Sequence, residues 1–163
     1  MQWFHSLSRH LVAGLVISLA CFAVAHADEL EGTWQLMKRK LPDGTVQTPP
    51  TVYGMNTFKN GMSQLIVFWP NPDGKPASIS QISRWEWSET SVTATPTLTI
   101  FDDGSGKLPA YAVGGERKSV PVIRQGGRVS YQHPLNPPFI VREGDKLTAT
   151  LEGVFTDYWE RVK

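Results

Sequence analysis

The chain has 163 residues, with sixteen basic and fifteen acidic side chains. This balance excludes the concentrated positive charge on which nucleic-acid binding depends, and it gives no reason to expect attachment to an anionic membrane surface. A single cysteine, Cys21, excludes a disulfide framework within the chain.

Residues 1–27 have the features of a cleaved signal peptide. An apolar run from Leu11 to Ala25 leads into an A-x-A cleavage site that ends at Ala27. The run is shorter than the roughly 20 residues that a membrane-spanning helix needs, so we expect no membrane span. Cleavage would leave residues 28–163, a length typical of one domain, with equal numbers of basic and acidic residues.

The expected destination is the periplasm, or secretion. The exported part keeps no cysteine, and a disulfide-free exported chain with a bacterial-looking signal favours the periplasm. The alternative is a lipoprotein, because Leu19-Ala20-Cys21 resembles the end of a lipoprotein signal, in which Cys21 would carry a lipid anchor. The residues before Cys21 are out of the usual order for such a signal, so cleavage after Ala27 is preferred.

The exported part has the pattern of short strands joined by turns, without any segment of ten or more residues at a helical period. Asp43-Gly44 and Asn60-Gly61 are hairpin dipeptides, because these residues tolerate positive φ. The expected strands are 32–40, 51–59, 62–69, 80–88, 92–101, 119–124, 128–133, 139–142, 146–151 and 154–162, and residues 46–50 are expected to be an extended edge or connection. We therefore predict an all-β fold, an antiparallel barrel of eight to ten strands that forms a single domain over residues 28–163.

Alternation assigns faces in the earlier strands. In strand 32–40, Trp34, Leu36 and Lys38 are expected to share one face. Residues 65–69 are apolar on both faces, as in a strand that is covered on both sides. Residues 70–76 contain three prolines and are expected to form a loop at the rim of the barrel.

The strand at 80–88 places two tryptophans on one face and two charges on the other. Burying Arg84 and Glu86 would cost several kcal/mol per ion, so Trp85 and Trp87 are predicted to point inward. In the following strand Pro96 cannot donate to a ladder, which predicts a bulge or an unpaired edge. Residues 102–118 are expected to form the longest irregular stretch, and loops of this length are usually functional or mobile.

The two ends of the barrel sequence carry a family resemblance. Gly32-Thr33-Trp34 opens the first strand, and Tyr158-Trp159-Glu160-Arg161 lies in the last. This combination resembles the lipocalins, and more closely the small bacterial lipocalin-like domains that begin Gly-Thr-Trp-x-Leu and close on Trp-x-Arg. The first and last strands of a barrel are neighbours, so Gly32, Trp34 and Arg161 are expected to close one end. A guanidinium stacked on an indole is worth roughly 0.5 to 2 kcal/mol.

The sequence contains few candidate catalytic residues or metal ligands. His133 is the one histidine of the exported part, and a histidine followed by proline is most often a turn residue. The ligand sets of zinc and copper cannot be assembled, no phosphate-cradling or dinucleotide motif is present, and neither a catalytic residue nor a metal or cofactor is assigned.

Aromatic and apolar side chains are the remaining indication of a functional site in the sequence. An eight-stranded barrel has an interior that is either filled by side chains or holds one small ligand. The residues expected to line such a site are Tyr53, Phe68, Trp85, Trp87, Leu98 and Tyr131.

The lipocalin resemblance implies a protein that binds or carries a small, largely apolar or amphipathic molecule. One alternative is an interaction module whose barrel is filled by side chains. The other is an isomerase or hydrolase that uses the same cavity, with Arg84 and Glu86 or His133 as polar groups.

Overall fold

The computed structural model describes residues 30–163. The expected signal peptide 1–27, its cleavage site at Ala27 and the lipoprotein alternative at Cys21 therefore lie outside the described residues. Within 30–163, no helix is long and apolar enough to cross a membrane.

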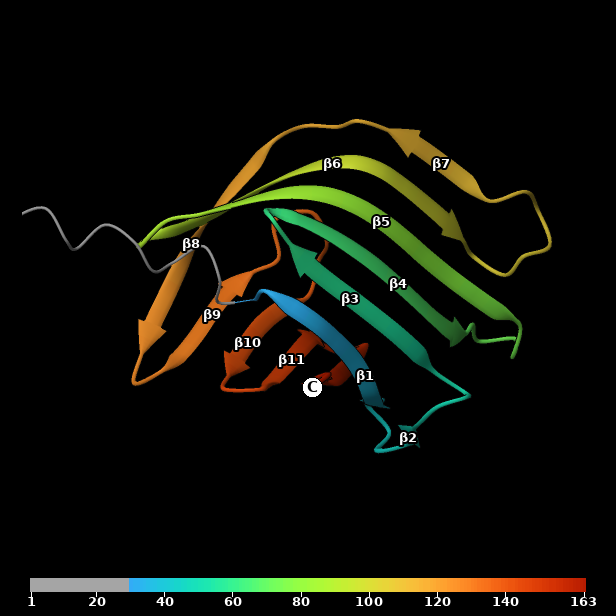
Figure 1. The fold of residues 1–163 in the computed structure, drawn as a ribbon. Helices are drawn as coiled ribbons and strands as arrows, with labels where there is room; N and C mark the ends of the chain where they lie inside the picture. The colour runs from blue at the N-terminus through green and yellow to red at the C-terminus, as the bar shows by residue number, and fades with distance from the viewer. Residues whose placement is uncertain (1–29) are drawn as a thin grey trace, which may run out of the picture.

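The described residues form a closed antiparallel barrel of ten strands with two further strands attached to it (Figure 1). The strands are β1 (Gly32–Lys40), β2 (Val46–Gln47), β3 (Tyr53–Lys59), β4 (Met62–Pro70), β5 (Pro76–Trp87), β6 (Ser91–Asp102), β7 (Ala110–Val113), β8 (Lys118–Gln125), β9 (Arg128–Gln132), β10 (Phe139–Glu143), β11 (Lys146–Leu151) and β12 (Phe155–Arg161). Around the barrel the order is β1-β3-β4-β5-β6-β8-β9-β10-β11-β12, and β12 pairs with β1 to close it. The all-β antiparallel prediction is confirmed.

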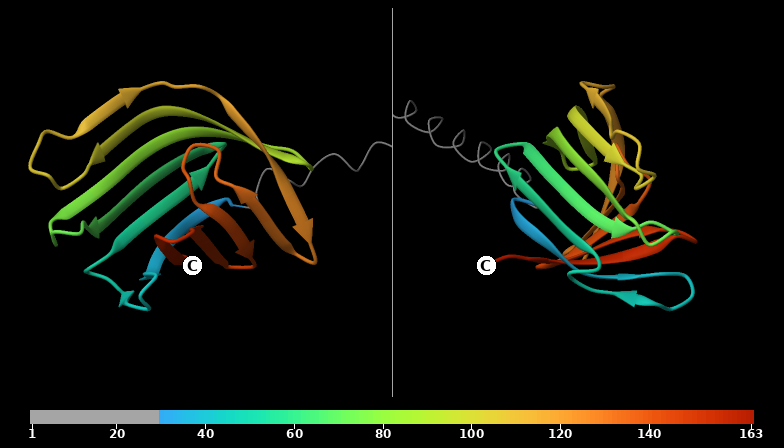
Figure 2. Two further views of the ribbon diagram at one scale, coloured as in Figure 1. Left: turned by 180° about the vertical axis from the view of Figure 1, so that it is seen from behind. Right: turned by 90° about the vertical axis from the view of Figure 1, so that its right-hand side faces the viewer.

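The strands of the barrel differ in length, so that one side of the barrel is longer than the other. β5 and β6 each have twelve residues and curve over one side, whereas β9, β10 and β11 are half as long or shorter (Figure 2). β2 pairs with the end of β1, and β7 pairs with the second half of β6.

The seam between β1 and β12 contains a bulge that changes which side chains point inward. Leu36 pairs with Trp159 and Lys38 pairs with Tyr158, so one extra residue of β1 stands between the two pairs. A bulge of this kind reverses the alternation that follows it. Lys38 is exposed, and Arg39 takes the inward place, being 6% exposed. The prediction that Lys38 shares the face of Trp34 and Leu36 is therefore wrong.

The face assignments in β5 are confirmed. Trp85 is buried at 4% exposed and Trp87 is half-buried, whereas Arg84 and Glu86 are both exposed. The bulge expected at Pro96 is also present, because Ser83 pairs with Pro96 while Ile82 already pairs with Leu98.

β7 lies inside the stretch 102–118, which was predicted to be irregular throughout. It pairs with β6 from Leu98 to Phe101, while β8 pairs with the start of the same strand. Between them the chain passes directly over Pro96. A Cβ at Gly115 would lie 2.4 Å from the Pro96 ring, and φ there is +157°, so this crossing requires a glycine.

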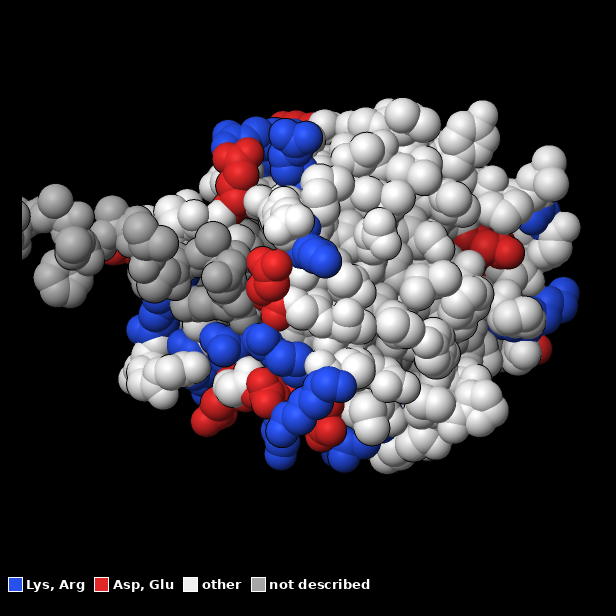
Figure 3. Space-filling model, in the orientation of Figure 1, with Lys and Arg blue, Asp and Glu red and all other residues white. Residues whose placement is uncertain are grey.

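The outer side of β4 is apolar and only partly covered. Ile66 pairs with Ser80 and is half-buried, and Phe68 is 41% exposed. Figure 3 shows that the face over β3 to β6 carries few charged side chains, most of which lie along the left side and the lower edge of this view. The prediction of a strand covered on both sides is wrong for the described residues, because only the inner side of β4 faces other strands.

Candidate ligand cavity

A cavity of about 740 Å³ occupies the barrel interior. Its wall consists mainly of inward side chains from alternate positions of the strands. The apolar members include Trp34, Phe58, Leu65, Val67, Trp69, Ile79, Phe101, Tyr131, Ile140, Leu147 and Ala149. Concave, mostly apolar spaces of 300 to 1,000 Å³ are typical of small-molecule sites.

One rim of the cavity is the turn at 71–75, within the loop predicted at 70–76. Pro70 and Pro76 are paired with each other at the end of β4 and the start of β5, so for these two residues the loop prediction is wrong. Pro70, Asn71 and Pro72 line the cavity. The Asn71 side-chain oxygen accepts hydrogen bonds from the backbone N–H groups of Asp73 at 3.0 Å and Lys75 at 2.9 Å. Its amide nitrogen donates to the Asp103 carbonyl at 3.2 Å. This one side chain therefore ties the loop to the neighbouring turn after β6.

A second, proline-rich segment at 133–138 turns into the barrel between β9 and β10. The Asn136 amide donates to the Gln81 side-chain oxygen on the inner side of β5 at 3.2 Å, and Gln81 is 6% exposed. Pro137 and Pro138 line the cavity. The segment thus contacts the wall formed by β5 and contributes to the lining of the cavity.

His133 begins this segment and has a turn role, as expected. Its Nδ1 accepts hydrogen bonds from the backbone N–H groups of Leu135 at 3.1 Å and Asn136 at 3.0 Å. The proton of the neutral ring must then lie on Nε2. Burial lowers the pKa of His133 to about 4, because the charged ring would be desolvated. The ring is neutral at pH 7, and its Nδ1 lone pair is already used.

Arg39 and Asp157 form a buried ion pair on the cavity wall. Arg39 Nε and Nη2 donate to the two carboxylate oxygens at 2.6 and 2.7 Å. Asp157 is 3% exposed, and burial raises its pKa above the ordinary value while Arg39 acts in the opposite direction. The guanidinium carbon also lies 4.1 Å from the Phe155 ring centre and 5.6 Å from that of Trp69.

Two polar side-chain atoms on other residues of the cavity wall have no hydrogen-bond partner among the described residues. They are the Asn56 side-chain oxygen and the Trp159 indole nitrogen, and both atoms are buried. Buried polar atoms are nearly always hydrogen-bonded, so these two are exceptions.

Trp85 and Trp87 point inward, yet they lie in a packed aromatic cluster outside the main cavity. Trp85 lies 5.4 Å from Phe58, 6.1 Å from Trp87 and 5.2 Å from His133, measured between ring centres. Its indole nitrogen donates to Ser63 at 3.0 Å and Ser83 at 2.8 Å. Both tryptophans border a second hollow of about 490 Å³.

The six residues predicted to bind a ligand are thus divided among three places. Tyr131 lines the main cavity, and Trp85 and Trp87 form the aromatic cluster. Tyr53 and Phe68 are register partners on the outer side of the barrel, and Leu98 pairs outside with Ile82. The structure does not bring the six together, because adjacent strands place Tyr53, Phe68 and Leu98 on the opposite face from Trp85.

Sequence reasoning missed Arg39 and Asp157. A signal for Asp157 was present, since it alternates with Trp159 in β12 and so shares its face. None was present for Arg39, because the bulge that turns it inward has no glycine or proline to mark it.

The closure expected at the ends of the chain is present. Trp34 is fully buried, and the Arg161 guanidinium carbon lies 4.8 Å from its ring centre. Arg161 Nη1 donates to the Glu31 carbonyl at 2.8 Å. Gly32, at φ +117°, lies beside the Arg161 side chain.

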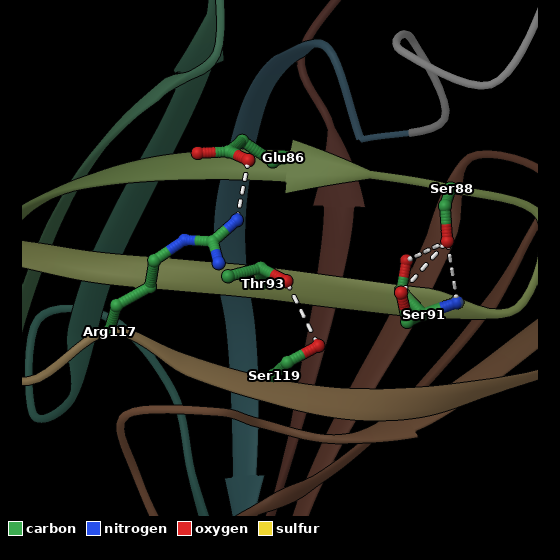
Figure 4. Close-up of polar contacts among 6 residues, drawn as sticks. All are labelled: Glu86, Ser88, Ser91, Thr93, Arg117 and Ser119. Carbon is green, nitrogen blue, oxygen red and sulfur yellow. Dashed lines mark hydrogen bonds and ion pairs between the residues drawn. The ribbon is translucent and has the colours of Figure 1, made fainter.

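Arg84 and Glu86, which were considered as the polar groups of an enzyme, both lie on the outer side of the barrel. Figure 4 shows Glu86 pointing to Arg117, with 2.8 Å between the Arg117 Nη2 and the carboxylate, and both side chains are exposed. Thr93 donates to Ser119 at 2.9 Å in the same region. Arg84 and Glu86 therefore cannot act on a molecule inside the cavity.

No family model and no curated protein matches this chain. Among solved structures, the crystal structure of an uncharacterized protein from Bacteroides eggerthii DSM 20697 is similar, with 11% identity and a TM-score of 0.33, over 81% of this chain and 98% of that chain. A likeness of this degree carries no argument about function, and the lipocalin resemblance stays a prediction.

Proposed function

We propose that this is an exported, lipocalin-like protein that binds or carries a small, largely apolar molecule inside its barrel. The cavity of about 740 Å³ is the observation that carries the proposal. Burying an apolar ligand against such a wall is favourable by roughly 25 cal/mol per Å² of apolar surface removed from water.

The two alternatives have less support. An interaction module requires a barrel filled by side chains, and a void of this volume argues against it. An enzyme requires a base with a free lone pair beside the substrate, whereas the Nδ1 lone pair of His133 is used by two backbone N–H groups.

Titration with a neutral fluorescent amine, N-phenyl-1-naphthylamine, tests the proposal. We expect saturable fluorescence enhancement that is lost in Ala149→Phe, since Ala149 is buried on the cavity wall and the larger ring would occupy the void. Thr148→Phe is the matched control, because the neighbouring residue of β11 points to the outer side and binding should persist. Absence of saturable binding to the unmodified protein would refute the proposal.

A further inference from the structure

The Arg39–Asp157 pair leaves hydrogen-bond donors unused beside the cavity. A guanidinium has five N–H donors, of which Asp157 takes one from Nε and one from Nη2. Nη1 makes no hydrogen bond to any residue within 30–163. Arg39 and Asp157 both line the cavity, and Arg39 is only 6% exposed. Nη1 is not one of the fully buried unpaired atoms of residues 30–163, so it keeps some accessible surface beside the cavity and can donate to an acceptor there.

The surroundings of Arg39 restrict where that acceptor can lie. Phe155 and Trp69 lie near the guanidinium carbon, and Asp157 covers the edge formed by Nε and Nη2. The direction left for an acceptor is toward Nη1. Leu41, Leu151 and Val154 also border the cavity and present no polar side-chain atom to a ligand. Gln47, the register partner of Arg39 on β2, also lines the cavity. Arg39 and Asp157 are therefore the charged groups in a wall that is otherwise mostly apolar and carries a few neutral polar side chains.

The charge of the pair decides which kind of acceptor fits. Arg39 is already balanced by the carboxylate that it chelates, so the net charge of the pair is zero. An anionic head group would add a second negative charge near Asp157 and would lose its hydration without a free counter-charge. An uncharged oxygen acceptor gains a charge-assisted hydrogen bond and avoids this cost.

We propose that the molecule bound in the cavity is an uncharged amphiphile, whose carbonyl, amide or hydroxyl oxygen accepts a hydrogen bond from Arg39 while its apolar body fills the barrel. This inference rests on the proposed function, since it names the chemical class of the ligand for the same cavity. It excludes ionised fatty acids as the preferred ligand.

Competition against N-phenyl-1-naphthylamine at pH 8 tests the inference with two probes of equal chain length. Decanamide is uncharged at this pH, and decanoate is ionised. We expect decanamide to displace the dye at a concentration at least tenfold lower than decanoate does. Decanoate that competes as well as decanamide would overturn the inference, although dye binding itself would still support the proposed function.

A paired substitution isolates the contribution of Arg39. In Arg39→Met/Asp157→Leu both charges are removed together, and apolar replacement of a buried pair is often tolerated. This variant should bind the dye, and the ratio of its decanamide affinity to its dye affinity should fall about ten- to a hundredfold, as for loss of a hydrogen bond to a charged group. Lys38→Met is the matched control, since Lys38 lies over the Tyr158 ring on the outer side and the ratio should not change. An unchanged ratio in the double variant would overturn the inference.

A single substitution should reverse the preference. Asp157→Asn keeps the shape of the side chain and leaves Arg39 with an unbalanced positive charge, so decanoate should now compete better than decanamide. If this variant does not fold, the double variant still decides. Failure of the dye to bind the unmodified protein would instead reject the proposed function, and this inference with it.

Discussion

His133 shows how a single residue can be fixed by backbone contacts. Two N–H groups of its own segment donate to Nδ1, and a protonated ring would turn that acceptor into a donor facing two donors. Geometry and burial therefore act in the same direction, and both favour the neutral ring.

This arrangement predicts a loss of stability in acid. The unfolded chain takes up a proton at His133 near pH 6.5, whereas the folded protein does so only near pH 4. The contribution of the neutral ring is complete above pH 6.5 and declines as the pH falls toward 4, by on the order of 1–3 kcal/mol.

Denaturant melts of the unmodified protein and His133→Asn at several pH values measure this loss. The asparagine oxygen can accept from the same N–H groups without titrating, so the difference between the two proteins should grow between pH 6.5 and 4 in favour of the variant. Parallel pH profiles would contradict the prediction.

Trp34 and Arg161 give a second prediction for single residues. Trp34→Ala should destabilise the protein by about 3–5 kcal/mol, because a large buried side chain is removed. Arg161→Ala should cost less, and the double variant should cost about 1 kcal/mol less than the sum, because the two side chains are in contact. A double-mutant cycle from urea melts measures the coupling, and strict additivity would show that the stacking has no energetic effect.

At the level of elements, the approach of β3 to β12 across β1 depends on a missing side chain. A Cβ at Gly54 would lie 2.6 Å from the Trp159 indole and 3.1 Å from the Leu36 Cβ. Such distances are too short for an alanine without movement of the neighbours. The glycine therefore allows the Trp159 ring to lie over β3 and to form part of the cavity wall.

Gly54→Ala should destabilise the barrel by about 1–3 kcal/mol through overpacking. The clash is with the distal edge of the Trp159 indole, so Trp159→Phe should remove most of the extra cost when the two changes are combined. The phenylalanine also lacks the unpaired indole N–H. Thermal unfolding of the four proteins tests this, and an equal effect of Gly54→Ala in both backgrounds would exclude the clash with Trp159 as its cause.

At the level of the whole molecule, closure of the barrel places residues from opposite ends of the chain in one ion pair. Arg39 and Asp157 are register partners on the first and last barrel strands, and both are buried. Each residue neutralises a charge that the interior could not otherwise accommodate.

Removing one partner should therefore be far more damaging than removing both. Arg39→Ala should cost about 3–5 kcal/mol because it leaves the Asp157 carboxylate buried and unpaired. Arg39→Met/Asp157→Leu should lie within about 1–2 kcal/mol of the unmodified protein, since two apolar chains of similar size fill the seam. Equilibrium unfolding measures both differences, and a double variant as unstable as the single one would mean that the pair is required for closure.

Local sequence was sufficient for the fold class and for part of the site. Alternation in β5 predicted the inward tryptophans, because the cost of burying Arg84 and Glu86 is a property of the residues themselves. The glycine and proline turns marked most strand ends, and these features depend on side-chain chemistry at short range. The contact between Trp34 and Arg161 was expected because the first and last strands of a predicted barrel are neighbours.

Tertiary structure decided the rest, because it depends on how strands pair across the chain. The bulge between Leu36 and Lys38 is defined only against β12, and it alone turns Arg39 inward. The segment 133–138 lies inside the barrel because Asn136 meets Gln81 on a distant strand. Phe68 and Leu98 have the same apolar character as the residues of the cavity wall, and register with their neighbours places them outside. Whether an apolar side chain lines a cavity is thus a property of the closed barrel and not of the strand that carries it.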